Sequence, residues 1–438
     1  HTDTAMNDYL QEAEYRNTDW FDALFSNSVM HNHSVSLSSG TEKASFYASL
    51  SAMADPGWYK DSEVNRYTAN LNATYNISKQ LSINLISSAA YMYTRNYADF
   101  NILHELDNNY MNLDVADLKF QGELKWKPIT GLEFSALGAV KYSATSQEHL
   151  ITDDSNQAMA YRAMPDATVR DRNPFLYTDP DNPYALPISV LPQGGIYQRT
   201  NYKMLGYDFR ATGSWNHVFV EKHIVNLFAG METNSSDRNK TYFNGWGMQY
   251  TQGEIPFYTY QFFKKSIEEG TDYYSLTNTR SRSAAFFTNA TYSYQGKYTV
   301  NGTYRYEGTN RLGKSRSARW LPTWNISAAW NMHEEEFFES LKPALAHFAL
   351  KASYSLTGDP GPNTVTNSTM VLKSYKPYRP FANIQESGLK IIDLANDDLT
   401  YEKKHELNIG ADMGFLDNRI NFAIDWYKRD NYDLIGVI

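Results

Sequence analysis

Hydrophobic and polar side chains alternate along much of the chain. In residues 419–435, RINFAIDWYKRDNYDLI, one set of alternating positions carries Ile420, Phe422, Ile424 and Trp426, and the other set is mainly polar. A period of two indicates a β-strand, because successive side chains on a strand point to opposite faces. The apolar face of such a strand can pack on a protein core or on lipid, so this choice decides the class of the protein.

The same alternation recurs in about 14 segments between the two ends of the chain. Many of these segments span about 10–14 residues, whereas strands of soluble proteins usually have about 5–6 and a tilted membrane-spanning strand needs about 9–11. The excess length favours lipid. The positions that we expect to face lipid, each paired with a neighbour that we expect to face a lumen, are Leu71 with Asn72, Leu124 with Glu123, Ile409 with Asn408 and Ile424 with Asp425.

Short and long connections alternate between the predicted strands. The stretches NISKQL, KPITGL, FVEKHI, SYQGKY and FLDNRI predict tight hairpin turns. Long polar stretches cover 146–200, 234–278 and 358–398, and loops of that length are uncommon in compact soluble domains. One connection on the short side, HEEEFFESLKPALAH at 333–347, predicts a small helix. Outer-membrane barrels have short periplasmic turns and long extracellular loops, so the pattern predicts an all-β fold, a transmembrane antiparallel β-barrel.

The composition agrees with a membrane barrel and excludes several other classes. Aromatic residues make up 15% of the chain, with 34 Tyr, while the mean hydropathy is only -0.57. The absence of cysteine excludes disulfides, thiol catalysis and cysteine-ligated metals, and the net charge of -9 argues against nucleic-acid binding. No apolar run approaches the roughly 18 residues of a transmembrane helix. The chain opens with HTDTAMNDYL, without an initiator Met or a signal peptide, so we expect it to belong to a longer precursor.

Five stretches, taken in order, resemble one family. They are NHSVSLSSGTEKASFYASLSAMADPG (32–57), RYEGTNRLG (305–313), LPTWNISAAW (321–330), LKASYSLTGDPG (350–361) and the segment 399–435 that begins LTYEKKHELNIG. Together they resemble the SusC-like TonB-dependent transporters of the Bacteroidetes outer membrane. The chain departs from the family pattern at Glu307, where Asp is usual, at Leu312, where Phe is usual, and at Tyr401, where Trp is usual.

The resemblance implies a barrel of about 22 strands around a plug. It also implies a segment that contacts TonB and a SusD-like lipoprotein lid that hands over glycans or peptides. No plug, TonB-contact segment or final set of strands is recognisable in this sequence. We therefore expect residues 1–438 to form the central part of one transmembrane β-barrel domain in the bacterial outer membrane.

Candidate chemistry is sparse. His31 and His33 share one face of a strand without a third metal ligand, and no catalytic constellation stands out. The stretches DDSNQ (153–157) and DPDNPY (179–184) are rich in oxygen ligands but match no complete EF-hand, which leaves a loop calcium site as an open alternative. We expect no enzymatic activity, no catalytic or metal-binding residue and no cofactor.

Ligand binding is a better prospect, in the aromatic loop 241–263 and at the tip of DPGWYKD. Aromatic rings can stack on the apolar faces of sugars, and the neighbouring amides can bond their hydroxyls. The few charges before Lys264 suit a neutral polar ligand. The alternative is that the rings pack the loops onto each other or onto a lid. The candidate ligand-binding residues are Trp58, Tyr59, Trp246, Tyr250, Tyr258 and Tyr260.

The leading functional hypothesis is TonB-dependent import of an oligomeric nutrient, a glycan in preference to a peptide. The expected partners are the lipid bilayer, TonB, a SusD-like lipoprotein and the oligosaccharide or oligopeptide, with no nucleic acid. A passive porin-like channel or a surface adhesin would need neither plug nor TonB. A soluble secreted glycan-binding β-protein remains a further alternative, which would not depend on detergent.

Overall fold

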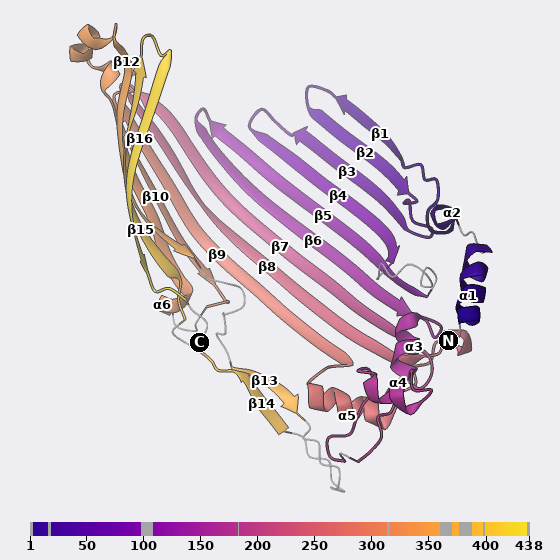
Figure 1. Ribbon diagram of the computed structural model, residues 1–438. Coiled ribbons are helices and arrows are strands. Elements are labelled where there is room, and N and C mark those ends of the chain that lie inside the picture. Colours follow the sequence, from indigo (N-terminus) through magenta and orange to yellow (C-terminus); the bar gives the residue numbers. More distant parts are fainter. Residues whose placement is uncertain are drawn as a thin grey trace.

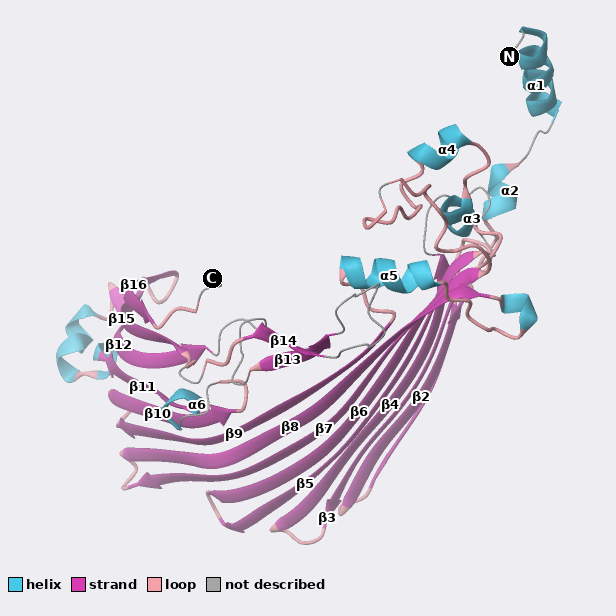
Figure 2. Ribbon diagram, turned by 90° about the horizontal axis from the view of Figure 1, so that it is seen from below, coloured by secondary structure: helices cyan, strands magenta, loops and turns pink. Residues whose placement is uncertain are grey.

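The chain forms one large curved antiparallel sheet, shown by the computed structural model in Figure 1. The structure describes residues 3–15, 19–97, 108–182, 184–312, 316–359, 370–375, 388–396 and 399–435. The sheet has 14 strands in the order β1 to β12, then β15 and β16, so neighbours in sequence are neighbours in space. Strands β13 and β14 form a separate 2-stranded sheet. Figure 2 shows the large sheet curving into an open trough.

The element bounds are as follows. The strands are β1 His31–Gly40, β2 Ala44–Asp55, β3 Glu63–Asn76, β4 Leu81–Tyr97, β5 Asn109–Ile129, β6 Leu132–Ile151, β7 Gly195–Phe219, β8 His223–Met248, β9 Tyr274–Tyr294, β10 Tyr298–Thr309, β11 Trp320–Asn331, β12 Leu345–Asp359, β13 Val371–Tyr375, β14 Gly388–Asp393, β15 Glu402–Phe415 and β16 Ile420–Tyr432. The helices are α1 Asp3–Tyr15, α2 Trp20–Leu24, α3 Asn156–Arg162, α4 Ala167–Arg172, α5 Tyr260–Glu269 and α6 Arg316–Arg319, and the 3-10 helices are η1 Tyr250–Gln252, η2 Met332–Glu334 and η3 Glu336–Leu341.

The strand register gathers the apolar positions on one face of the sheet. Residues that lie directly opposite each other in an antiparallel pair share a face. Leu71 lies opposite Ala48 and Ser87, and Leu124 lies opposite Ile83 and Ala136. Ile409 and Ile424 fall on this same apolar face, and Asn72, Glu123, Asn408 and Asp425 fall on the other. The sequence prediction of the two faces is confirmed.

Short and long connections lie at opposite ends of the strands. Tight turns join β3 to β4, β5 to β6, β7 to β8, β9 to β10 and β15 to β16. The helices α3, α4 and α5 and the hairpin β13–β14 lie at the other end (Figure 1). The predicted helix at 333–347 is confirmed as η2 and η3, although β12 already begins at Leu345.

The predicted bounds of the long loops were too wide. Strands β6 to β9 extend to Ile151, Gly195, Met248 and Tyr274, so the connections cover only 152–194 and 249–273. The alternation does not predict these strand ends, because no regular apolar period continues into them. The predicted loop 358–398 contains β13 and β14, and its residues 360–369, 376–387 and 397–398 lie outside the described residues.

Helices contribute only short elements at the rims. Helix α5 begins at Thr259, whose hydroxyl accepts the backbone N–H of Phe262, and ends at Gly270 in the left-handed conformation. None of the described helices is both long and apolar enough to cross a membrane.

Candidate functional site

The two long loops above β6–β9 share a small hydrophobic core. Trp246, at the end of β8, stacks on Phe262 of α5 with 5.1 Å between ring centroids. Val190 and Leu191 from the loop 152–194 are almost fully buried beside them, and Ile196 adds the start of β7. A loop with its own hydrophobic core has a fixed shape, so the loops at this rim of the sheet present a defined surface.

Three of the predicted ligand-binding aromatics belong to this packing. Trp246 is only 7% exposed, and its indole N–H donates to the carbonyl oxygen of Val190 at 2.8 Å. The hydroxyl of Tyr250 donates to the carbonyl oxygen of Ile196, and that of Tyr258 donates to Asn244. Burial raises the pKa of Tyr250 above its ordinary value. These rings pack the loops onto each other, which was the alternative to ligand contact.

The other predicted aromatics keep more of their surface. Tyr260, at the start of α5, is 61% exposed, and Trp58 is 68% exposed. Trp58 and Tyr59 lie in the connection between β2 and β3, where Phe25 packs 5.1 Å from the ring of Tyr59. The structure thus brings Trp58 and Tyr59 together and leaves Tyr260 on a different loop.

The carboxylates of the candidate calcium loop surround a lysine. Lys264 of α5 is 2% exposed and forms ion pairs with Asp179, with Asp181 at 2.8 Å and with Glu268 at 3.7 Å. Tyr177 donates a hydrogen bond to Glu268 at 2.9 Å. The hydrogen bond from Lys264 holds the pKa of Asp179 below its usual value. The ammonium group of Lys264 supplies the positive charge that a calcium ion would supply. It also links the loop 152–194 to α5.

The polar face of the sheet is lined by hydroxyl and amide groups that bond to each other between strands. Ser51 and Thr68 are joined by a hydrogen bond of 2.6 Å. The amide of Asn301 donates to Thr291 at 2.6 Å, beside Asn289. Such a wall offers many donors and acceptors to a hydrated ligand.

The chain matches the family model described as TonB dependent receptor-like, beta-barrel, over residues 5–438. The chain belongs to the TonB-dependent receptor β-barrel family. The protein is therefore an outer-membrane protein: the apolar face of its sheet faces lipid, and its polar face lines the lumen. The soluble alternative is excluded by this assignment.

Two relatives of this TonB-dependent receptor barrel agree with the family assignment. It is 24% identical over 450 residues to the TonB-dependent receptor SusC of Bacteroides thetaiotaomicron, with 96% of this chain and 43% of that protein covered. It is 23% identical to the TonB-dependent receptor P39 of Formosa agariphila, with 94% of this chain and 38% of that protein covered. The chain thus spans about two fifths of the length of these relatives.

Among solved structures, the RagAB peptide transporter has a similar fold. Its TM-score to this chain is 0.67 at 17% sequence identity, with 95% of this chain and 46% of that chain covered. The family resemblance read from the sequence motifs is confirmed.

The receptor motif RYEGTNRLG places an ion network on the lumen face. Arg305 bonds Glu232 of β8 at 2.7 Å and Glu307 at 2.5 Å. The guanidinium groups of Arg210 and Arg305 both lie over the ring of Phe287, at 5.4 and 5.8 Å from its centroid. Glu307 thus forms an ion pair with Arg305, and it keeps the negative charge of the Asp in the family pattern.

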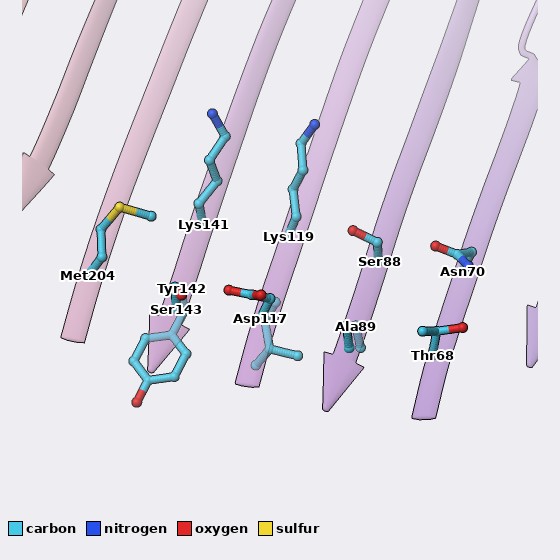
Figure 3. A pocket seen from close by; sticks show the side chains of 12 residues that line it. Thr68, Asn70, Ser88, Ala89, Asp117, Lys119, Lys141, Tyr142, Ser143 and Met204 are labelled. Carbon is cyan, nitrogen blue, oxygen red and sulfur yellow. The ribbon is translucent and has the colours of Figure 1, made fainter. Parts of the chain in front are cut away.

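Sequence reasoning missed one feature of the lumen wall. A depression of about 310 Å³ crosses β3 to β7 and is lined on the lumen face by Lys119 and Lys141 among small polar residues. Figure 3 shows the two lysine side chains extending side by side in the same direction. Each lysine occupies a polar position of its strand, so the alternation gave its face, but only the register shows that the two are neighbours.

Proposed function

We propose that the full-length protein imports an oligomeric nutrient, a glycan rather than a peptide, across the bacterial outer membrane. Energy comes from the inner membrane through TonB, and a SusD-like lipoprotein seated over the long loops delivers the ligand. The family membership and the relative named SusC support this proposal. RagAB is a peptide transporter, and a peptide is therefore the competing ligand.

The hydroxyl- and amide-lined lumen face carries the proposal. A sugar chain needs its many hydroxyl groups bonded as water is removed, because an unpaired buried hydroxyl is costly. Side chains such as Thr68, Asn70 and Ser88 line the depression in the wall and can replace that water. The protein performs no covalent chemistry in this role. It captures, releases and guides the ligand.

The decisive test is the energy dependence of uptake. Fluorescent starch, xylan, galactan and polygalacturonate oligomers are offered to cells that carry or lack the gene, with and without TonB. We expect uptake of at least one oligomer to require both the gene and TonB, and to stop when a protonophore collapses the proton gradient. Uptake that survives the loss of TonB would establish a passive porin-like channel instead.

The lipoprotein lid needs its own test. Purification of the tagged protein in mild detergent should recover a lipoprotein in a one-to-one ratio. Recovery of the tagged protein without any lipoprotein would contradict the lid.

We further propose that Trp58 and Tyr260, which keep exposed rings, contact the ligand. Trp58→Ala with Tyr260→Ala should weaken uptake while the amount of folded barrel stays at the wild-type level. Trp246→Ala serves as the comparison, because it should disturb loop packing first. Unchanged uptake by the double variant would remove these contacts from the site.

A further inference from the structure

The lumen face carries a group of basic side chains that the sequence does not reveal as a group. Lys119 of β5 lies directly opposite Lys141 of β6. On β8, Arg238 lies opposite Met204 and Lys240 opposite Tyr202. We call Lys119, Lys141, Arg238 and Lys240 the basic lumen patch; only β7 separates its two halves, because Met204 lies in turn opposite Ser143 of β6.

Most of this charge is uncompensated. Among the residues that the structure describes, Lys141 pairs with Asp208 at 2.6 Å, whereas Lys119 and Arg238 have no ion pair. The ammonium of Lys240 lies 5.5 Å from the centre of the Tyr202 ring, which leaves its charge available. Like charges directly opposite each other destabilise a sheet, so the pairing of Lys119 with Lys141 has an energetic cost.

The wall around the patch is hollowed. The depression at Lys119 and Lys141 is continued by a second one, of about 410 Å³, at Arg238 and Lys240, and the two share Ser143 and Met204. Asp117 is the carboxylate that lines the first depression, and none of the described residues that line the second is a carboxylate.

A buried hydroxyl gives an independent observation beside the patch. Ser236 lies two positions from Arg238 on β8, and opposite it stands Gly206, which has no side chain. Ser236 is only 7% exposed, and its Oγ has no hydrogen-bond partner in the part of the chain that the structure describes. A buried hydroxyl without a partner in the protein can form a hydrogen bond with a ligand or a water molecule.

The height of the patch in the barrel follows from the outward face of β7. This face is apolar at Phe209, Tyr207 and Leu205 and becomes polar at Lys203. The hydrocarbon boundary therefore lies near Leu205, close to Met204 at the centre of the patch. A ligand that enters from the long loops meets the patch where the lumen passes into the membrane.

We propose that the basic lumen patch binds the carboxylate or sulfate groups of an anionic glycan during import. This inference rests on the proposed function and narrows its substrate class. Arg238 can hold a carboxylate or sulfate with paired N–H donors, and the lysines supply mobile positive charge. The polar groups of Ser88, Asn70, Thr277 and Thr279 lie where they can bond sugar hydroxyls. The aromatic loop alone suggests a neutral ligand, and the lumen wall overrides that expectation.

The test uses the full-length transporter in its host, with the oligomers polygalacturonate and sulfated galactan as anionic probes and starch and xylan as neutral ones. Casein phosphopeptides form a further arm. The variant combines Lys119→Gln, Arg238→Gln and Lys240→Gln. Lys404→Gln is the matched control, because Lys404 lies on the lumen face of β15, outside both depressions. The amount of folded barrel is measured for each variant.

We expect TonB-dependent uptake of polygalacturonate or sulfated galactan, and the responding probe identifies carboxylate or sulfate as the bound group. Each lost charge-assisted bond weakens binding by about tenfold or more, so uptake at low probe concentration should fall at least that far in the triple variant. Lys404→Gln should match the wild type. Added salt should reduce uptake by the wild type more than uptake by the triple variant.

Other results would overturn the inference. Uptake restricted to starch or xylan would assign a neutral ligand, and uptake restricted to phosphopeptides would assign a peptide. If the triple variant imports anionic glycans normally but admits a large antibiotic that the wild type excludes, the patch holds a segment of the protein itself. Absence of any gene-dependent uptake would instead refute the proposed function.

Discussion

A charge placed at the centre of the lipid-facing side of β5 should prevent assembly, whereas the same charge one residue away should not. Phe120 lies on the apolar face opposite Ser87 and Val140, near the middle of the outward column that runs from Ala116 to Trp126. Gln121 lies on the lumen face, opposite Ile86 and Ala139. The two positions share a strand and a depth in the membrane. The two substitutions therefore differ mainly in whether the new side chain meets lipid or the lumen.

The expected cost follows from the depth. An arginine at the midplane of a membrane barrel costs about 2–4 kcal/mol, which corresponds to a loss of about 30-fold to 700-fold in the folding equilibrium. Phe120→Arg should suffer this loss, and Gln121→Arg should stay close to the wild type. Ala116→Arg, near the outer boundary, should cost only about 0–1 kcal/mol.

The amount of folded barrel is measured in outer membranes by its resistance to trypsin and by the mobility shift on heating in detergent. An equal loss in Phe120→Arg and Gln121→Arg would show that the two faces are not lipid and lumen. An equal loss in Phe120→Arg and Ala116→Arg would contradict the depth assigned to the column.

Three further outcomes are expected. Protease added to intact cells should cut within 249–273 and spare the turn at 416–419, and the reverse pattern would invert the topology. Lys264→Met should release the loop 152–194, because it leaves the carboxylates of Asp179, Asp181 and Glu268 without their cation. Deuterium exchange in that loop should rise, while Lys265→Met, at a partly exposed lysine whose ion pair lies within α5, should leave it unchanged. The folded pKa of Asp179 is depressed, so its stabilising effect is complete above the ordinary carboxyl pKa of about 4 and is lost as the pH falls through the lower folded value. Deuterium exchange in the wild-type loop should therefore rise only below about pH 4. This rise should be absent in Lys264→Met.

The strands and their two faces could be predicted because lipid contact requires an apolar side chain at every second position. The extensions of β6 to β9 could not, because a strand that has water on both sides has no such requirement. The segment from Asn234 to Lys240 is polar on both faces and resembles a loop, yet it pairs without interruption with β7 and β9. Backbone pairing, which the side-chain pattern does not record, holds it.

The candidate site was predictable only in part for a different reason. Trp246 and Tyr260 occur in the same aromatic loop, and nothing in the composition tells that one ring is buried and the other exposed. The basic lumen patch joins Lys119 to Arg238 across β5 to β8, and this proximity depends on the exact pairing of each strand with the next. Contacts that are distant in sequence are set by register, so a single sequence gives each residue its face but not its neighbours.

The uneven length of the strands gives the barrel wall an uneven height. β8 has 26 residues and β1 has 10. At about 3.3 Å per residue, β8 is about 86 Å long, while a tilted strand crosses the hydrocarbon with only about 9–11 residues. More than half of β8 thus stands in water, and the edge of the sheet at β1 is lower. A large ligand would meet a tall wall at β8 and a low wall at β1. Its approach to the lumen face would therefore be directional rather than equal from all sides.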